Sequence, residues 1–270
     1  MKPARILHGL GLLAVLVFAV FPFYWMVSSS FKTGADILAS PPRWLFAPTL
    51  EHYQAVFADQ KVTSAIVDSL VVALCTTVLA VALGTPAAYA LARFEFRGKP
   101  DLWFWFISNR MISPIVLALP VYLLARQAGL LDTYLVLILV YLTFTLPIVV
   151  WICTDQFRSI PPELEQAARL DGVNQFGIFW RIYLPLGLPG VAVSAIFSFI
   201  FSWNELLFAL VLTRRGVQTA PVVATSFMSG YEVPWGKIMA TGTLIVLPVT
   251  IFALLVSRHM IRGLTMGASK

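Results

Sequence analysis

The 270-residue sequence is poor in charge: 12% of its residues are Asp, Glu, Lys or Arg, whereas 59% are hydrophobic. Soluble domains carry about 25% charged residues on average. With half that share, neither a water-soluble globule nor a disordered chain is expected. The net charge of +6 does not predict a nucleic-acid surface, because the basic residues lie in short loops between apolar segments.

Cysteine and histidine, the usual residues of metal and redox sites, are rare. The two cysteines, Cys75 and Cys153, lie inside apolar runs, so neither a disulfide framework nor a zinc ligand set is predicted. The three histidines, His8, His52 and His259, are not placed with carboxylates in the pattern of a metal site or a hydrolytic triad. We therefore expect no metal centre and no catalytic residues.

A phosphate-binding loop is missing as well. Many ATPases carry G-x-x-x-x-G-K-[ST], whose backbone N–H groups surround the phosphates. Gly98-Lys99 and Gly236-Lys237 have neither the upstream glycine nor the following serine or threonine. The chain is therefore not expected to hydrolyse ATP or to bind a cofactor itself.

What the sequence has instead is long apolar runs. A helix that crosses a bilayer needs about 20 mostly apolar residues, and six stretches qualify, which predicts an all-α membrane protein with six transmembrane helices. The stretches are Ile6–Val27, Ile66–Ala92, Leu102–Ala125, Tyr134–Cys153, Leu188–Leu212 and Ile238–Ile261. The first is about 22 residues long, too long for a signal peptide, and ends in Phe21-Pro22-Phe23-Tyr24-Trp25, so we interpret it as a retained helix.

Six crossings place both termini on one side of the membrane. Basic residues are more frequent on that side, which comprises the two ends and the loops after the second and fourth spans. The positive-inside rule then predicts cytoplasmic termini. It also places the loop of about residues 157–187 inside and the loop of about residues 28–64 outside.

Small residues recur at every fourth position of the second predicted span, on one helix face. They are Thr76, Ala80, Gly84, Ala88 and Ala92. This spacing lets another backbone come close. Ordinary packing against a neighbouring helix is the favoured interpretation, and a face for another subunit or for a passing solute is the alternative.

The cytoplasmic loop between the fourth and fifth spans is the most informative segment. Residues 160–172 read IPPELEQAARLDG, and residues 173–185 read VNQFGIFWRIYLP. The two prolines favour a helix start, and Glu163 and Glu165 complement its positive end. Asp171-Gly172 favours a turn. The loop is therefore predicted to project as a short helix, a sharp turn and a second helix that ends at Pro185.

The first of these helices is too short to fold alone. Leu164, Ala167 and Ala168 share one of its faces, and the alanines allow close approach. This pattern predicts a helix that docks in a groove of a partner. The alternative is a helix that lies against the inner face of its own chain.

Gln166-Ala167-Ala168, followed by Gly172, Ile182 and Leu184-Pro185, resembles the EAA loop of ABC-importer permeases, the binding-protein-dependent transport inner membrane components. The likeness extends over nearly the whole chain and is closest to the carbohydrate-uptake branch, of the maltose-permease G type. The other segments that carry it are Ala87–Arg93 (AAYALAR), Pro120–Tyr122 (PVY), Gly129–Thr133 (GLLDT), Trp203–Glu205 (WNE) and Gly263–Lys270 (GLTMGASK).

The resemblance implies a single transmembrane permease domain over residues 1–270, with core helices at about 65–262. It implies half of the pathway of an ATP-driven importer in the cytoplasmic membrane of a prokaryote. The implied partners are a second homologous permease, two ATPase subunits that use ATP and Mg, an external solute-binding protein, a carbohydrate substrate and membrane lipid. The implied residues of ATPase coupling are Glu163, Glu165, Gln166, Ala167, Ala168, Asp171, Gly172, Ile182, Leu184 and Pro185.

One residue departs from the family pattern. The motif has a glutamate where this chain has Gln166, so the charge is lost while the hydrogen-bonding reach is kept. An arginine of the partner would make a weaker, neutral contact with Gln166. Glu165 or Glu163 is a candidate to supply the missing charge.

Polar residues at membrane depth are candidates for the translocation pathway, because charges in spans usually face a cavity or a partner. Arg110 has three possible roles: binding a sugar hydroxyl, pairing with Glu205, or capping carbonyls of a helix broken near Pro114. Trp203, Asn204 and Glu205 combine a stacking ring with two hydrogen-bonding groups, which suits a sugar. Packing between helices explains the same residues equally well.

Two other functions were weighed against an importer subunit. A secondary transporter or channel acting alone would show inverted repeats and helices broken at mid-membrane, and no convincing internal repeat is found. A membrane-embedded enzyme would need a nucleophile with a base, or a metal set. The sequence offers no credible set of either kind, and a transporter acting alone would leave the Ala-Ala-Gly loop unexplained.

Overall fold

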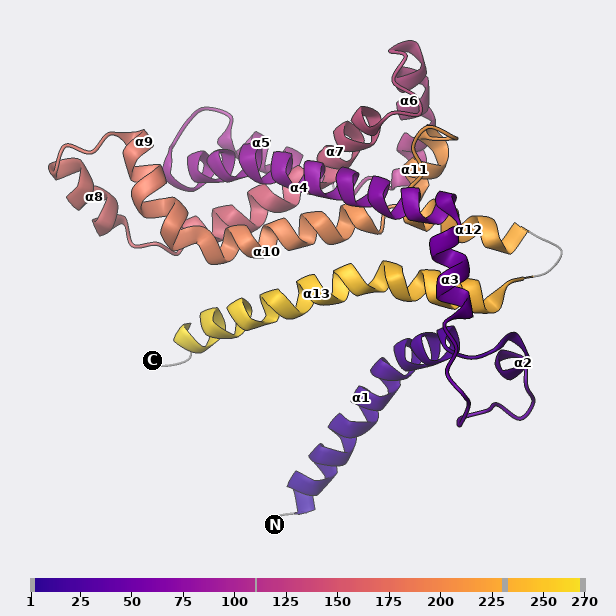
Figure 1. The fold of residues 1–270 in the computed structure, drawn as a ribbon. Helices are drawn as coiled ribbons and strands as arrows, with labels where there is room; N and C mark the ends of the chain where they lie inside the picture. Colours follow the sequence, from indigo (N-terminus) through magenta and orange to yellow (C-terminus); the bar gives the residue numbers. More distant parts are fainter. Residues whose placement is uncertain (1–2, 110, 230–232, 268–270) are drawn as a thin grey trace. The chain divides into compact units, whose positions relative to one another are not determined.

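The computed structural model describes residues 3–109, 111–229 and 233–267, and all regular structure in these ranges is helical (Figure 1). Five segments of it are long and apolar enough to cross a membrane. They belong to α1 (Pro3–Ser30), α4 (Gln60–Arg93), α7 (Tyr134–Arg158), α10 (Leu184–Trp203) with the turns before it, and α13 (Trp235–Gly267). With the shorter apolar helix α6 (Pro114–Gln127), they confirm the predicted all-α membrane fold.

Shorter helices connect these segments. They are α2 (Gly34–Ile37), α3 (Glu51–Ala58), α5 (Lys99–Ser108), α8 (Pro162–Leu170), α9 (Gln175–Ile178), α11 (Leu207–Leu212) and α12 (Ala220–Ser226), with a π-helical turn at Phe179–Tyr183 and a 3-10 turn at Phe227–Ser229. In the loop after the fourth span, the predicted short helix and turn are present as α8 and Asp171-Gly172, and a second helix begins at α9. The prediction that this second helix ends at Pro185 is wrong, because Pro185 lies in the first turn of α10, where its missing N–H is tolerated.

The third predicted span, Leu102–Ala125, is wrong as one helix: it is divided into α5 and α6. Pro114 is the first residue of α6, where its missing N–H costs nothing. The same proline pushes Ser113 out of the helical region, and Ser113 has φ −66° and ψ 128°. A count of apolar residues does not reveal this break, and it therefore predicted one long span.

The fifth predicted span, Leu188–Leu212, is also divided. α10 begins earlier, at Leu184, and ends at Trp203. After residues 204–206 the chain continues as α11. The carboxylate of Glu205 accepts the N–H groups of Phe208 (3.1 Å) and Ala209 (3.3 Å), so it satisfies donors at the start of the new helix.

The contacts divide the chain into two compact units. The first comprises residues 1–64 and 223–248, and the second comprises residues 65–222 and 249–270. The second unit has two apolar cores at opposite ends of α4 and α7. One core includes Ala88, Phe157, Tyr183 and residues of α8 and α9, and the other includes Val72, Leu137, Tyr141 and residues of α6 and α11.

α4 and α7 lie side by side along the face of small residues predicted from the sequence. Thr76, Ala80 and Ala88 are fully buried. The Thr154 hydroxyl on α7 lies 3.4 Å from the carbonyl oxygen of Ala88. A Cβ at Gly84 would come within 2.7 Å of Val149 Cγ1. The favoured interpretation, packing against a neighbouring helix, is therefore confirmed.

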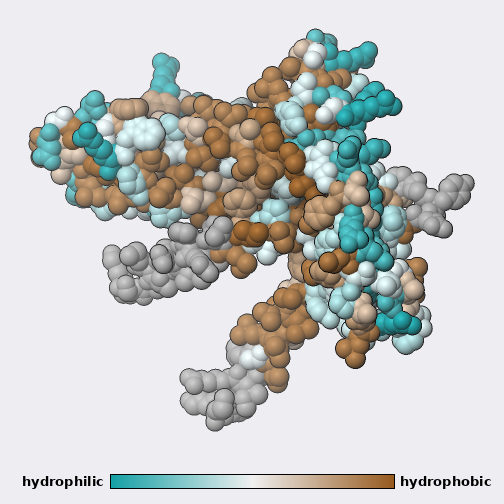
Figure 2. Space-filling model, viewed as in Figure 1, coloured by the Kyte–Doolittle hydropathy of each residue, from teal (hydrophilic) through white to brown (hydrophobic). Residues whose placement is uncertain are grey.

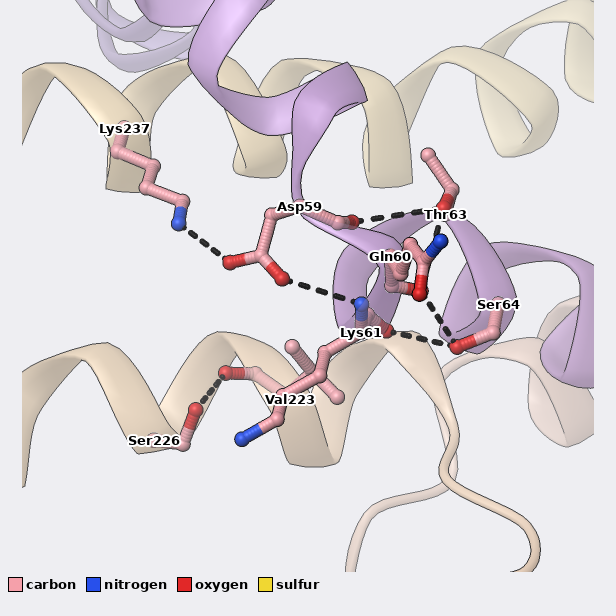
Figure 3. Close-up of polar contacts among 8 residues, drawn as sticks. All are labelled: Asp59, Gln60, Lys61, Thr63, Ser64, Val223, Ser226 and Lys237. Carbon is pink, nitrogen blue, oxygen red and sulfur yellow. Dashed lines mark hydrogen bonds and ion pairs between the residues drawn. The ribbon is translucent and has the colours of Figure 1, made fainter.

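The first unit joins segments far apart in the sequence. Lys237, near the start of α13, donates to Asp59 Oδ2 at 2.6 Å (Figure 3). The other carboxylate oxygen, Oδ1, accepts the N–H of Lys61 at 3.1 Å, at the junction of α3 and α4. The lysine and the backbone N–H together lower the pKa of Asp59, against the opposing effect of burial.

Apolar side chains cover much of the molecular surface, as a membrane environment requires (Figure 2). In the candidate span of α1, Gly9–Ser30, no residue of the most apolar stretch is buried within the chain. Hydrophilic residues gather on the segment of α8 and α9, at the end of the second unit. The division between apolar helices and polar loops follows the sequence pattern.

Candidate functional site

The loop of α8 and α9 is the first candidate site, and a glycine turn gives it its shape. Gly172 follows α8 with φ +78°, a conformation that side chains disfavour. Its N–H donates to the Arg169 carbonyl at 3.1 Å, and the N–H of Val173 donates to the Ala168 carbonyl at 3.0 Å. These bonds close the end of α8. The turn predicted at Asp171-Gly172 is confirmed.

Glu165 attaches α8 to the rest of the second unit. Its side chain is buried, at 8% exposure. It accepts the Tyr183 hydroxyl at 2.8 Å and an Arg169 guanidinium N–H at 2.6 Å. Glu165 is therefore bound within the chain and does not offer its charge outward.

The opposite side of α8 is open. Glu163, Leu164, Gln166 and Ala167 are exposed, and Leu170 reaches 89% exposure. Ala168 points the other way and belongs to the apolar core. The face predicted from Leu164, Ala167 and Ala168 is therefore divided: the first two are outward and the third is inward. The helix therefore packs against its own chain on one side and presents a free surface on the other.

The remaining predicted coupling residues lie around this helix. Asp171, Gly172 and Pro185 are exposed, and Ile182 and Leu184 are half-buried against the core of α4, α7 and α10. Phe176 and Trp180 add two exposed aromatic rings beside α8. The outward surface thus combines exposed apolar side chains with polar ones, and Glu163 is the acidic residue of α8 that has no salt bridge among the described contacts.

Two residues that the sequence did not mark as functional hold the loop in place. The Arg93 guanidinium, at the end of α4, donates to the carbonyls of Phe157 and Ile160 and lies 4.8 Å from the Tyr183 ring centre. Tyr89 donates to the Gln175 side chain at 3.1 Å. The signal available was the AAYALAR segment, whose tyrosine and arginine are these two residues.

A π-helical turn carries Tyr183 into its place. Residues 179–183 form this turn between α9 and α10, and Phe179 and Tyr183 are buried on it. Turns of this kind are rare and occur often at functional sites. Tyr183 contacts the rings of Tyr89 (4.8 Å) and Phe157 (6.0 Å), which are on α4 and α7.

A second polar cluster lies at the opposite end of the second unit. Asp132 has φ +62° and accepts the backbone N–H groups of residues 214–217, at 2.8 to 3.2 Å. Burial alone would raise the pKa of Asp132, but the four N–H donors outweigh it and lower the pKa to about 2. The GLLDT segment therefore joins the start of α7 to the loop after α11.

Asp68 contributes to the same cluster. Its carboxylate is buried and accepts the Tyr134 hydroxyl at 2.6 Å and the N–H of Gln218 at 3.0 Å. The adjacent Ser69 hydroxyl accepts the N–H of Ala220 at 2.7 Å. These contacts fix the loop of residues 214–220 on α4 and α7.

The predicted pathway residues lie at the break between α10 and α11. Trp203 is buried and stacks on Phe199, with ring centres 5.6 Å apart. Asn204 is exposed and donates to the Ile200 carbonyl at 2.9 Å. Glu205 binds backbone N–H groups of α11. Arg110 lies outside the described residues, so its three possible roles remain predictions.

Residues 80–266 match a family described as "Binding-protein-dependent transport system inner membrane component". The chain is 38% identical to the trehalose transport system permease protein SugB of Mycobacterium tuberculosis, over 95% of this chain and 94% of that protein. It is 32% identical to the trehalose/maltose transport system permease protein MalG of Thermococcus litoralis, over 98% of this chain and 97% of that protein.

A solved structure has a similar fold. It is a crystal structure of a bacterial ABC transporter involved in the import of the acidic polysaccharide alginate. The TM-score is 0.77 at 23% identity, with 96% of this chain and 98% of that chain covered.

Proposed function

Because the chain belongs to the family of binding-protein-dependent transport system inner membrane components, we propose that it forms half of the pathway of an ATP-driven carbohydrate importer. It is a multi-pass transport subunit of the inner membrane, not an enzyme. The observation that carries the proposed cargo is the 38% identity to a trehalose permease over nearly the full length of both chains.

The proposed complex has five components besides the sugar. This chain pairs with a second homologous permease, two ATPase subunits bind ATP and Mg, and an external binding protein delivers the carbohydrate. A second alginate transporter structure of the same fold, at a TM-score of 0.69, contains a periplasmic protein bound to an alginate pentasaccharide, which supports an external donor. Both termini of this chain lie in the cytoplasm.

The outward side of α8 is the proposed contact with an ATPase. Glu163, Gln166, Ala167 and Leu170 are exposed there, while Glu165 and Ala168 hold the helix on its own bundle. A helix of nine residues needs tertiary packing to be stable, and the inward contacts supply it. Because Glu165 is internally paired, Glu163 supplies the charge that Gln166 lacks.

A substitution on the exposed side tests this coupling. Ala167→Phe adds a large side chain on the outward face without disturbing the buried one, and Ala55→Phe makes the same change at an exposed position of α3. In the complex reconstituted in vesicles, the variant at position 167 should lose ATPase assembly and uptake, whereas the variant at 55 should keep both. Normal assembly and uptake with Ala167→Phe would overturn the proposed contact.

The cargo class is tested with the same vesicles. Uptake of labelled trehalose and maltose is compared with uptake of a labelled dipeptide and of phosphate, in the presence of the binding protein and ATP. We expect uptake of a carbohydrate only. Uptake confined to a solute that is not a carbohydrate would contradict the proposed cargo while leaving the coupling surface intact.

Arg110, Trp203, Asn204 and Glu205 are the proposed pathway residues. Asn204 is the exposed member of the group at the break between α10 and α11. Glu205 sets the start of α11 and so positions the break itself. Asn204→Ala should raise the KM for uptake with little change in thermal stability, because its hydrogen bond joins only its own helix end.

A further inference from the structure

The loop between α1 and α3 folds back on itself. The N–H of Thr49 donates to the carbonyl of Phe31 at 2.8 Å and closes the base of the loop. Within it, the Thr33 hydroxyl accepts the N–H of Asp36 and donates to its carboxylate at 2.8 Å, which caps the short helix α2. The loop is thus an ordered structure of the first unit (Figure 1).

The part of the loop between Thr33 and Glu51 carries no uncompensated charge. Residues 34–50 read GADILASPPRWLFAPTL, and their only charged side chains, Asp36 and Arg43, pair at 2.6 Å. The neighbouring Lys32 is buried, with its ammonium 4.4 Å from the ring centre of Trp25 and 5.1 Å from that of Phe46. Cation–π contacts of this length stabilise a desolvated lysine.

Trp44 places the loop beside the last turns of α1. Its ring lies 5.5 Å from that of Trp25 and 6.5 Å from that of Phe21. These two residues precede the helix end at Ser30 by five and nine positions, which is about 7 and 13 Å at 1.5 Å per residue. The apolar stretch of α1 runs to Ser30. The loop therefore lies at the depth where a spanning helix meets the membrane–water boundary.

The side chains that the loop exposes are apolar. Leu45 is 94% exposed, Leu38 72% and Trp44 56%. Of the paired charges, the Arg43 side chain is 63% exposed and that of Asp36 only 12%, so the cation is on the outside. Apolar residues with an outward arginine match a lipid surface, which offers acyl chains below and phosphates above.

We propose that residues 38–50 form an interfacial membrane anchor, with Leu38, Trp44 and Leu45 in the leaflet at the C-terminal end of α1. The ligand of this surface is phospholipid. The loop is continuous with a spanning helix, its two charged side chains pair with each other, and the side chains that it exposes are apolar. A docking protein is the rival occupant, and the closeness of Trp44 to Phe21 and Trp25 disfavours it.

The test attaches a nitroxide to Leu45→Cys in the full chain, with Cys75→Ser and Cys153→Ser removing the native thiols. Gln54→Cys, at an exposed polar position of α3, is the matched control. In phosphatidylcholine–phosphatidylglycerol nanodiscs, we expect the label at 45 to collide several-fold less often with a water-soluble nickel chelate, and more often with oxygen, than the label at 54. Its depth should be about 5–10 Å.

Three outcomes decide the inference. Equal nickel accessibility at 45 and 54 would overturn it. A label at 45 that is water-accessible in nanodiscs and becomes protected only when the binding protein is added would also overturn it, in favour of a docking surface. Protection that depends on lipid and is the same with and without the binding protein supports the anchor, whatever the cargo proves to be.

Discussion

At the scale of single residues, two glutamates of one short helix have different environments. Glu163 is exposed, whereas Glu165 is buried and accepts hydrogen bonds from Tyr183 and Arg169. The sequence marks both as acids in the first turn of a helix and gives no means to separate them. What separates them is the hydrogen bond from Tyr183 to Glu165, two residues that lie 18 positions apart in the chain.

We therefore predict that the two substitutions affect different properties. Glu165→Ala leaves the buried Tyr183 hydroxyl without its acceptor, which costs about 1–3 kcal/mol of folding free energy and should lower the melting temperature of the purified chain. Glu163→Ala should leave melting unchanged but weaken ATP-driven uptake. Equal melting temperatures for the two variants in a thermal-shift measurement would contradict the internal role of Glu165.

Asp132 gives a prediction for pH. Its pKa is held at about 2 by four backbone N–H donors, below the ordinary value of 3.8. A carboxyl group whose pKa is lower in the folded than in the unfolded state stabilises the fold at pH values above its unfolded pKa. This stabilisation is lost as the pH falls from about 4 to about 2. Discounted for solvent screening, the contribution is about 1 kcal/mol.

Asp132→Asn should therefore melt at a lower temperature than the parent chain at pH 7 and approach it at pH 3. Asp101→Asn, at a loop-proximal position with no such bonds among the described contacts, is the comparison variant. Melting followed between pH 3 and pH 7 checks the expectation. A difference for Asp132→Asn that is the same at every pH would refute it.

At the scale of elements, apolar length predicted which segments are helical but not where they break. Pro114 and Glu205 mark the two breaks, and each was visible in the sequence. Both lie inside runs of apolar residues. A proline in such a run does not by itself end a membrane helix, because neighbouring groups can satisfy the backbone groups that it leaves without hydrogen bonds. Only the tertiary contacts decide whether such a residue bends a helix or ends it.

The packing of α4 on α7 was predictable in kind, and it can be tested with a compensating pair. Gly84→Ala places a methyl group 2.7 Å from Val149 Cγ1, which is closer than carbon atoms pack, so the helices must separate. We expect a loss of about 1–3 kcal/mol. Adding Val149→Ala removes the clashing methyl groups and should restore part of it.

Melting of the two single variants and the double variant provides the measurement. Gly34→Ala, where a Cβ meets nothing within 4 Å, is the matched glycine control. If the double variant is no more stable than Gly84→Ala, the contact with Val149 is not what makes the glycine necessary.

At the scale of the whole molecule, the topology of the second unit followed from the sequence. The loops predicted to share one side of the membrane do meet: Arg93 bonds to the carbonyls of Phe157 and Ile160, and Asp132 bonds to residues 214–217. Because each span crosses the membrane once, successive loops are expected on alternate sides. The individual bonds were not predictable, because they join residues 64 to 85 positions apart.

The ion pair of Asp59 and Lys237 joins parts of the chain 178 positions apart, and a charge exchange tests it. Lys237→Asp puts two carboxylates together and also removes the ammonium from the Phe227 ring, 4.8 Å away. It should destabilise the chain by about 1 kcal/mol or more. The double variant Asp59→Lys/Lys237→Asp should recover more than half of this loss.

The local pair of Lys99 and the exposed Glu95 is the control, since it joins residues four positions apart only. Glu95→Gln should leave the melting temperature unchanged. Failure of the exchanged pair to recover any stability over Lys237→Asp would show that the attraction between these two charges does not hold the segments together.

Arg93 has a mechanical consequence. At the end of α4, its guanidinium donates to the carbonyl of Phe157 in the last turn of α7 and lies over the ring of Tyr183, which directly precedes α10. Since Tyr183 also donates to Glu165 of α8, these contacts link α8 to the ends of α4, α7 and α10. If an ATPase binds α8 as proposed, these hydrogen bonds and ring contacts would carry its movement into the bundle directly, with no unstructured linker between α8 and the helix ends.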